Sequence, residues 1–302
     1  MYDTIRTVAD AHADSIWALA WTAGTNRIVT GSLDDTVHLW SGASFARQTQ
    51  LREHHLGVGS VAVNAAGTLL ASSSLDSQIR LTDLRTDTNQ AVIDAGALEA
   101  WALALNPSGD TLATGSHAGA VHLWNTGNAE GDAEKQGQKR ATVETGGAFV
   151  LSVAISPDAR TLAAGTESGI VHLIDLASGK RLNALQGHTA GVRALAFSPD
   201  ANMLVTGSDD HRIHLYDVHN ADYLSSLAGH ANWVTALDFS PDGAHFASAS
   251  TDKRVKIWDT ASRQCVHTFT DPTEPVWGVA YNGDGSRLAT VGDARALTIY
   301  ST

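Results

Sequence analysis

The sequence is short of several features that define common protein classes. It has one cysteine, Cys265, which excludes an intrachain disulfide and favours a reducing compartment. No apolar run approaches the roughly 20 residues that a membrane-spanning helix needs. Charged residues such as Asp3, Arg6 and Asp10 interrupt any signal-peptide segment at the start of the chain. These absences predict an intracellular protein with no membrane partner.

Positive charge is also scarce. The chain has 20 lysines and arginines against 32 aspartates and glutamates, for a net charge of −12. Nonspecific binding to nucleic acid depends on clustered lysine and arginine side chains that displace counterions. Anionic membrane surfaces attract the same clusters. The charge balance therefore disfavours direct contact with nucleic acid or with a membrane surface.

Motifs that carry chemistry are missing as well. The chain has no phosphate-binding Walker loop, no dinucleotide fingerprint, no G-x-S-x-G elbow and no zinc-ligand spacing. Its 14 histidines do not cluster, because His38, His122, His172 and His214 fall one to a repeat in the pattern described next. We predict no catalytic site, no metal and no cofactor.

The chain does have a fixed period. Short apolar runs close at Trp40, Thr82, Trp124, Ile174, Tyr216, Trp258 and Tyr300. Five of the six gaps between these residues are 42 residues long, and the sixth, from Trp124 to Ile174, is 50. A period in this range is typical of repeated supersecondary units that share a continuous core. We therefore interpret residues 1–302 as a single domain of seven units.

Each unit is predicted to contain four short strands. In the fifth unit, Val192, Ala194 and Ala196 alternate with other residues in the period-two pattern of a strand, and Ser-Pro-Asp at 198–200 favours a turn. Four strands of about five or six residues, with their turns, fill such a unit. Residues 4–8 form a lone strand before the first unit, and the last unit stops after its third strand. We predict that the N-terminal strand completes the last unit.

Polar residues recur at matching places. A histidine opens four units, an aspartate follows 22 residues later, and the closing residue comes six further on. The set comprises His12, Asp34, Trp40, His54, Asp76, His188, Asp210, His230, Asp252 and Trp258. Histidine, aspartate and a hydroxyl could form a hydrolase triad, but four copies at one spacing favour a structural role. The third, fourth and seventh units lack both the histidine and the aspartate.

This spacing resembles the WD-repeat family over essentially the whole chain. The resemblance implies an all-β, seven-bladed β-propeller whose blades are four-stranded antiparallel sheets. It also implies that the histidine, the aspartate, a serine or threonine and the tryptophan form a buried hydrogen-bond network in each complete blade. The longer gap contains residues 126–141, which are polar and glycine-rich, and we predict a flexible loop insertion there.

The narrow top face is where the propeller is expected to bind a partner. In the WD-repeat family, residues that flank the buried aliphatic residue of each first strand project onto this face around the channel. The predicted partner-binding residues are Trp17, Trp101, Phe149, Leu151, Arg193, Asp209, Trp233 and Trp277. Exposed tryptophans of this kind are typical of interaction sites. The alternative is that these side chains pack on one another in the channel mouth.

Carboxylates lie near this aromatic set in the sequence. They are Asp35, Glu99, Glu167, Asp209 and Asp293. Aromatic side chains with carboxylates beside them suit a short peptide that carries an arginine and a hydrophobic anchor. We therefore expect the partner segment to bring positive charge to the top face.

Longer stretches, among them HADSIWALAW, LVTGSDDHRIHLYDV and VWGVAYNGDGSRLATVGD, are similar to one subfamily, the WD-repeat subunits of the superkiller complex, animal and plant type. The resemblance implies a non-catalytic scaffold in exosome-dependent cytoplasmic 3'–5' mRNA decay. Its partner would be a tetratricopeptide-repeat subunit and, through it, an RNA helicase. A second, nuclear role in the polymerase-associated factor complex is also implied.

The same resemblance gives expectations for the site. In that subfamily the top face grips a Gln-Arg-containing segment that ends in an aromatic residue. Carried over, Trp17, Trp101, Trp233 and Trp277 would be the apolar contacts. We expect a monomer when the chain is on its own, located in both cytoplasm and nucleus.

Two other functions stay open at this stage. The tryptophans could form an aromatic cage for a methylated lysine, as in a chromatin reader. Alternatively, Thr-Asp-Leu-Arg at 82–85 resembles the adaptor-binding box of ubiquitin-ligase substrate receptors, although its aromatic residue is missing. Neither interpretation adds a catalytic site to the chain itself.

Overall fold

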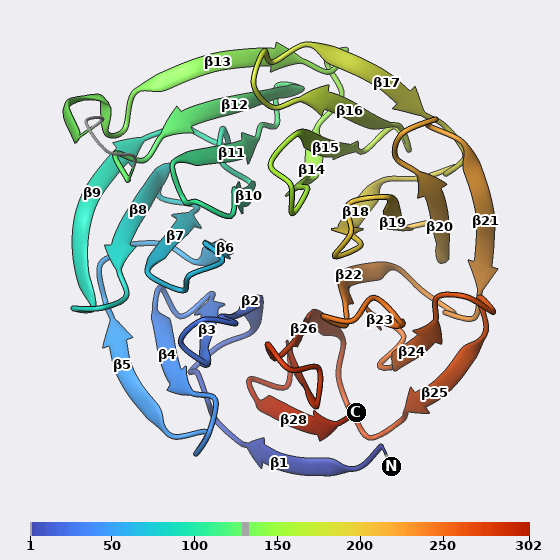
Figure 1. Ribbon diagram of the computed structural model, residues 1–302. Helices are drawn as coiled ribbons and strands as arrows, with labels where there is room; N and C mark the ends of the chain where they lie inside the picture. Colours follow the sequence, from blue (N-terminus) through green and yellow to red (C-terminus); the bar gives the residue numbers. More distant parts are fainter. Residues whose placement is uncertain (1, 129–132) are drawn as a thin grey trace.

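The computed structural model describes residues 2–128 and 133–302. Their strands form seven four-stranded antiparallel sheets. The sheets are arranged like blades around a central channel, with the first strand of each blade innermost and the fourth outermost (Figure 1). The predicted all-β seven-bladed propeller is therefore confirmed.

The blades follow one another in chain order. Blade 1 contains β2 (Ile16–Trp21), β3 (Arg27–Ser32), β4 (Val37–Ser41) and β5 (Arg47–Leu51). Blade 2 contains β6 (Val58–Val63), β7 (Leu69–Ser74), β8 (Gln78–Asp83) and β9 (Thr88–Asp94). Blade 3 contains β10 (Ala102–Leu105), β11 (Thr111–Gly115), β12 (Ala120–Asn125) and β13 (Lys139–Glu144). Blade 4 contains β14 (Val150–Ile155), β15 (Thr161–Thr166), β16 (Val171–Asp175) and β17 (Arg181–Leu185).

The remaining blades complete the ring. Blade 5 contains β18 (Val192–Phe197), β19 (Met203–Ser208), β20 (Arg212–Asp217) and β21 (Tyr223–Ala228). Blade 6 contains β22 (Val234–Phe239), β23 (His245–Ser250), β24 (Val255–Asp259) and β25 (Cys265–Phe269). Blade 7 contains β26 (Val276–Tyr281), β27 (Arg287–Gly292), β28 (Leu297–Ser301) and, as its outer strand, β1 (Thr4–Val8).

The two ends of the chain close the ring together. β1 pairs antiparallel with β28, so that Thr7 lies opposite Thr298. The backbone N–H of Ser301 donates to the carbonyl of Asp3 at 2.8 Å. Both ends therefore lie at blade 7 (Figure 1). The prediction that the N-terminal strand completes the last blade is confirmed.

The predicted loop at 126–141 is too long at its C-terminal end. β13 begins at Lys139, so residues 139–141 belong to a strand, and Lys139 lies opposite Trp124 of β12. The ammonium of Lys139 lies 4.9 Å from the centre of the Trp124 ring. A short 3-10 helix, Ala133–Lys135, occupies part of the connection. Residues 129–132 of the predicted loop lie outside the described residues.

The apolar core lies between neighbouring blades. Val234, the first residue of β22, is fully buried against blade 5. A Cβ on Gly207 of β19 would lie 2.5 Å from the Cγ1 of Val234, so the absence of a side chain there lets the two blades approach closely. This packing holds the starts of the inner strands at the rim of the channel. The residue after the buried valine then projects into the channel mouth.

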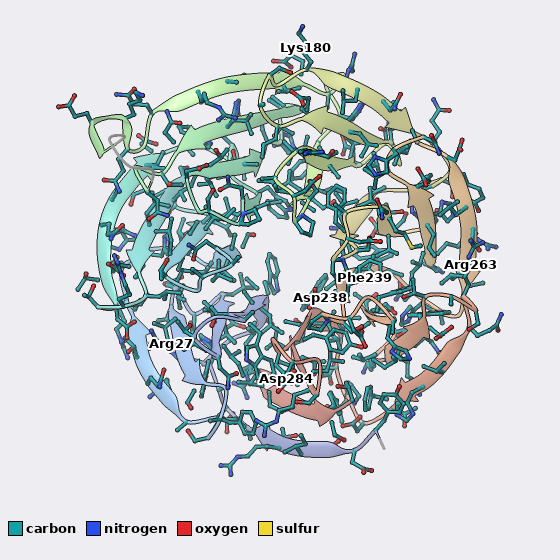
Figure 2. The ribbon with its side chains drawn as sticks, viewed as in Figure 1. Arg27, Lys180, Asp238, Phe239, Arg263 and Asp284 are labelled. Atoms are coloured by element: carbon teal, nitrogen blue, oxygen red, sulfur yellow. The ribbon has the colours of Figure 1, made fainter. Side chains whose placement is uncertain are left out.

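Asp238 ties two inner strands together. It lies on β22 beside the channel (Figure 2), and its Oδ2 accepts the backbone N–H of Tyr281 in blade 7 at 2.7 Å. Burial raises the pKa of Asp238 to about 7, although this hydrogen bond acts in the opposite direction. Since the carboxyl group bridges β22 and β26, it contributes to the contact between blades 6 and 7.

The recurring polar residues meet inside the blades. In blade 1, the Nδ1 of His12 lies 2.9 Å from Asp34 and its Nε2 lies 2.7 Å from the hydroxyl of Thr30. The Nε1 of Trp40 donates to the same hydroxyl at 2.9 Å. An indole N–H can only donate and a carboxylate can only accept. The imidazole therefore donates from Nδ1 to Asp34, and the hydroxyl of Thr30 accepts from Trp40 while it also bonds Nε2.

The same contacts recur in blades 2, 5 and 6. The distances are 3.1 Å for His54 to Asp76, 2.9 Å for His54 to Ser72, 2.9 Å for His188 to Asp210, 2.7 Å for His188 to Thr206, 2.9 Å for His230 to Asp252 and 2.7 Å for His230 to Ser248. Blade 6 also has the indole contact, from Trp258 to Ser248 at 2.8 Å. Blade 2 has Thr82 in place of the tryptophan. Ser248 thus serves two partners, whereas Ser72 serves the histidine.

A second histidine stacks on the first in two of these blades. The ring centres of His12 and His38 are 3.7 Å apart, and those of His188 and His214 are 3.9 Å apart. Burial lowers the pKa of His38 to about 4, and the neighbouring His12 adds to this effect. Burial likewise lowers the pKa of His214 to about 4, with a contribution from His188. The sequence pattern gave no indication of these stacks.

We expect His214 to make the fold less stable as the pH falls. The unfolded chain protonates this imidazole near its ordinary pKa of about 6.5, whereas the folded chain does so only near about 4. The unfolded state therefore binds more protons between these values, and stability declines as the pH is lowered through that window. The variant His214→Phe keeps a flat ring against His188 and should lose less stability from pH 7 to pH 4.5, as measured by urea unfolding. An unchanged decline would contradict the assignment.

Candidate functional site

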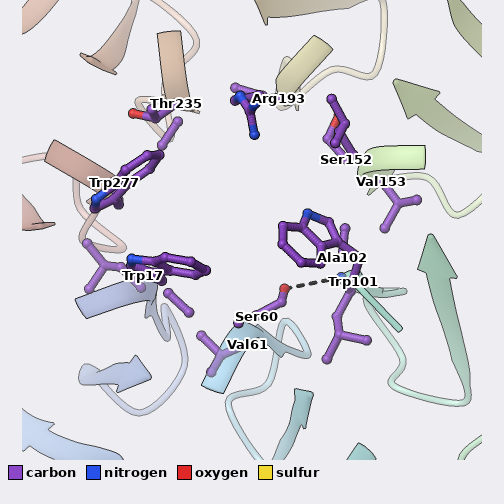
Figure 3. A pocket seen from close by; sticks show the side chains of 18 of the residues that line it. Trp17, Ser60, Val61, Trp101, Ala102, Ser152, Val153, Arg193, Thr235 and Trp277 are labelled. Carbon is purple, nitrogen blue, oxygen red and sulfur yellow. Dashed lines mark hydrogen bonds between the residues drawn. The ribbon is translucent and has the colours of Figure 1, made fainter. Parts of the chain in front are cut away.

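One end of the channel is lined by the second residue of each inner strand or its neighbour. These seven residues, called the mouth ring here, are Trp17, Gly59, Trp101, Leu151, Arg193, Thr235 and Trp277. With the strands below them they enclose a cavity of about 340 Å³ (Figure 3). That volume lies within the range of peptide and small-molecule pockets. All seven blades contribute to the cavity.

The aromatic side chains of the mouth form two separate pairs. The rings of Trp17 and Trp277 are tilted at 46°, with centres 5.9 Å apart. Trp101 packs edge-on against Phe149 at 5.2 Å, and Phe149 in turn contacts His117 at 4.7 Å. The predicted alternative of mutual packing is therefore realised within pairs. The two pairs still leave indole surface facing the cavity between them (Figure 3).

Trp233 lies at the rim instead of in the cavity lining. Its side chain is 39% exposed, and the guanidinium of Arg193 lies 4.6 Å from its ring centre. A cation over an indole face is an attractive arrangement. Trp233 thus supports Arg193 from outside, while Leu151 lines the cavity on the other side.

Two carboxylates at the mouth are bonded within their own blades. The Nε of Arg193 donates to Asp209 at 2.5 Å, and the Nε1 of Trp277 donates to Asp293 at 2.7 Å. In both pairs the partners are 16 residues apart, at the start of the inner strand and in the turn after the second strand. These contacts orient Arg193 and Trp277 at the rim. The same contacts occupy the carboxylates of Asp209 and Asp293, whose negative charge we expected to face a partner.

Two further carboxylates are engaged as well. Glu99 lies 2.7 Å from the Nε2 of His122, and Glu167 accepts the backbone N–H of Phe149 at 3.1 Å. Burial acts to raise the pKa of Glu99, but its hydrogen bond to His122 and nearby positive charge outweigh this and hold the pKa below its usual value. Asp35 does not line the cavity. The third blade thus replaces the usual histidine–aspartate pair with Glu99 and His122.

Hydroxyl groups in the cavity wall are used between blades. Ser60 accepts from the backbone N–H of Leu103 at 3.1 Å, Ser152 donates to the carbonyl of Val192 at 2.8 Å, and Thr235 donates to the carbonyl of Val276 at 2.6 Å. Each bond joins an inner strand to the next one around the ring. These three hydroxyl groups therefore stabilise the contacts between neighbouring inner strands.

Exposed leucines extend the apolar surface beside Trp101. Leu75 and Leu98 are 41% and 45% exposed. Leu75 lines the main cavity, and with Leu98 and Trp101 it lines a smaller hollow next to it. These leucines were not among the residues predicted to bind a partner. Leu75 occupies the same place in its repeat as Asp209, so aligning the repeats would have placed it at the mouth.

The described residues provide neither a metal site nor a membrane-spanning helix. Within residues 2–128 and 133–302, no three histidine, cysteine, aspartate or glutamate side chains are grouped so that they could hold a metal ion. No helix in this part of the chain is long and apolar enough to cross a membrane. The four histidine–aspartate–hydroxyl sets lie in four different blades, and in each the histidine and the hydroxyl residue are buried while the aspartate is partly exposed.

Comparison with known families agrees with this architecture. The WD domain, G-beta repeat, matches residues 3–41, 46–83 and 263–300. The Echinoderm microtubule-associated protein second beta-propeller matches residues 100–274, which is more than half of the chain. The chain belongs to the WD40-repeat β-propeller family. A mouth lined by exposed indole rings suits contact with another protein.

Three curated relatives of this WD40 propeller share moderate identity. It is 40% identical over 146 residues to WD repeat-containing protein SL1-17 of Schistosoma mansoni, covering 46% of this chain and 48% of that protein. It is 36% identical over 127 residues to WD repeat-containing protein VIP3 of Arabidopsis thaliana, covering 40% of each. It is 32% identical over 101 residues to Superkiller complex protein 8 of Dictyostelium discoideum, covering 32% and 33%. The matched parts thus span less than half of each relative.

Proposed function

We propose that this WD40 propeller is the scaffold subunit of a superkiller-type complex. In this role it supports 3'–5' mRNA decay by the exosome in the cytoplasm, and it has a second, nuclear role with the polymerase-associated factor complex. The observation that carries the proposal is the mouth itself, where Trp17, Trp101 and Trp277 line a cavity of about 340 Å³ that opens to solvent. The likeness to VIP3 and to Superkiller complex protein 8 supports it.

The partner in this proposal is a tetratricopeptide-repeat subunit that also holds an RNA helicase. A short segment of that subunit enters the mouth, and its apolar side chains cover the exposed indole faces. Leu75 and Leu98 enlarge the surface that such a segment can bury. Aromatic side chains at the centre of a contact carry most of the binding energy in protein interfaces.

A methyl-lysine reader fits the mouth less well. Such a site surrounds a cation with aromatic faces. The charged residue that lines this cavity is Arg193, itself a cation. A methylated lysine entering between Trp17 and Trp101 would meet this positive charge in partly desolvated surroundings, which opposes its binding.

Affinity capture tests the proposed function. The tagged full-length chain is expressed in its native cells at native level and recovered under stringent salt washes, with the tag alone as the control. Mass spectrometry should identify a tetratricopeptide-repeat protein together with an RNA helicase, and polymerase-associated factor subunits from nuclear extract. Recovery of ubiquitin-ligase adaptors or histones in their place would contradict the superkiller assignment, while leaving the scaffold role intact.

A further inference from the structure

The mouth has hydrogen-bond donors that lack acceptors. Arg193 donates through Nε to Asp209, but neither of its two Nη groups has an acceptor among the described residues. The Nε1 of Trp101 likewise has no acceptor there, although the equivalent indole of Trp277 donates to Asp293. Figure 3 shows the guanidinium of Arg193 and the indole of Trp101 both extending into the open space.

Among the described residues, no side chain of the cavity wall accepts a hydrogen bond from these donors. Among the described residues that line it, Arg193 is the one charged side chain, and the rest are mainly apolar. The hydroxyls of Ser60, Ser152 and Thr235 are already bonded between neighbouring blades. A ligand that satisfies the mouth must therefore bring an acceptor, and a carboxylate is the strongest acceptor for a guanidinium fork.

We propose that the mouth binds a partner segment in which an aspartate or glutamate side chain lies next to a large apolar side chain. The carboxylate accepts from the Nη groups of Arg193 and from Trp101, and the apolar side chain packs between the indoles of Trp17 and Trp101. This inference deepens the proposed scaffold function and rests on it for the use of the mouth. It replaces the expectation of an arginine-bearing segment, because four of the five acidic residues expected near the mouth already have partners within the chain, and the fifth, Asp35, does not line the cavity.

The long-range field of the protein does not favour this acidic ligand. The net charge of −12 repels anions at a distance. Recognition must therefore depend on the local donors, which makes the proposal specific to Arg193. A second arginine, Arg160, lies in the turn before β15, and its side chain is 83% exposed. Replacing it removes the same charge without touching the mouth, so Arg160→Gln is a matched control.

The test begins with a selection. A phage library of random dodecapeptides, fused so that they have no free C-terminus, is selected on the full chain and counter-selected on Trp101→Ala. We expect enriched peptides to contain an acidic residue at a fixed distance from an aromatic or large aliphatic residue. Enrichment of arginine or lysine without an acidic residue would overturn the proposal, and so would peptides whose binding does not depend on Trp101.

Synthetic versions of the enriched peptides then identify the contact. By fluorescence polarisation, Arg193→Gln should weaken binding roughly 10- to 100-fold, the usual loss for a hydrogen bond to a charged group, whereas Arg160→Gln should leave it within about threefold. Replacing the peptide's glutamate by glutamine leaves the protein unaltered and should cause the same loss. Combining this peptide with Arg193→Gln should add little further loss. If the glutamate peptide and its glutamine version bound the unmodified chain with equal affinity, the proposal would be wrong.

The outcomes separate this inference from the proposed function. If capture recovers the superkiller subunits and Trp101→Ala loses them while Arg193→Gln retains them, the acidic-segment inference fails and the scaffold proposal stands. If acidic peptides bind through Arg193 but capture recovers no superkiller subunits, the proposed complex is wrong and the recognition chemistry stands.

Discussion

Ser248→Ala is expected to destabilise the fold substantially more than Ser72→Ala, although both remove the same hydroxyl from the same place in a blade. Ser248 bonds both His230, at 2.7 Å, and the indole of Trp258, at 2.8 Å. Ser72 bonds His54 at 2.9 Å, and its blade has no tryptophan to satisfy. Each buried group left without a partner costs about 1–3 kcal/mol. We expect losses of about 2–4 kcal/mol for Ser248→Ala and about 1–2 kcal/mol for Ser72→Ala.

Urea unfolding followed by circular dichroism measures this difference. The midpoint should move further for Ser248→Ala, while the dependence on urea stays the same in both variants. Because neighbouring blades share their cores, the comparison holds only if each variant still unfolds in a single transition. Equal losses would show that the hydroxyl stabilises a blade through its histidine alone, and that the indole finds another acceptor or water.

Trp101→Ala is expected to weaken partner binding by about 2–4 kcal/mol, the range for a central aromatic contact. This corresponds to roughly 30- to 1000-fold in dissociation constant. Trp101 is more informative than Trp277, because no acceptor for its Nε1 is found among the described residues, whereas Trp277 donates to Asp293. The corresponding change at Trp277 would also leave Asp293 without its donor. The effect of Trp101→Ala therefore combines the loss of its contacts with the partner and of its packing against Phe149.

Tyr223→Ala provides the control for this measurement. Tyr223 is also aromatic and is 52% exposed, but it lies on β21, the outermost strand of blade 5, away from the channel. Isothermal titration with the partner recovered by capture should show the loss for Trp101→Ala and little change for Tyr223→Ala. Thermal unfolding of both variants should remain a single transition with a modestly lower midpoint, because Trp101 packs on Phe149 and Tyr223 packs on His214 and Tyr216. A comparable loss in both would place the interface on the blade sides.

The propeller could be predicted because its signals are periodic. The closing residues recur at 42-residue spacing, and the turns between strands carry proline, aspartate and glycine, so strand number and order follow. The end of the loop after Trp124 was misplaced for a physical reason. Residues 139–141 are polar or small, as an outer strand facing solvent permits, and their composition resembles that of the loop before them.

The mouth could be predicted as a set of positions but not as a set of contacts. Counting one residue past the buried aliphatic residue at the start of each inner strand places Trp17, Arg193 and Trp277 correctly in the cavity wall. The hydrogen bonds of Asp209 and Asp293 depend on side-chain direction in turns 16 residues away. Single-sequence patterns carry no information on such directions. The sign of the charge presented to a partner therefore emerges only from the folded arrangement.

The closing strand has a consequence for how the chain is made. Leu297, where the partner strand begins, follows Val8 by 289 residues. At about 5–20 residues per second, translation leaves the first strand without its neighbour for roughly 15–60 s. Four of its five side chains are exposed even in the finished ring, and the charge of Arg6 among them discourages pairing with a foreign edge. The seventh blade therefore forms only after the ribosome has added its last strand, and nascent chains stalled earlier would present an open ring to chaperones and proteases.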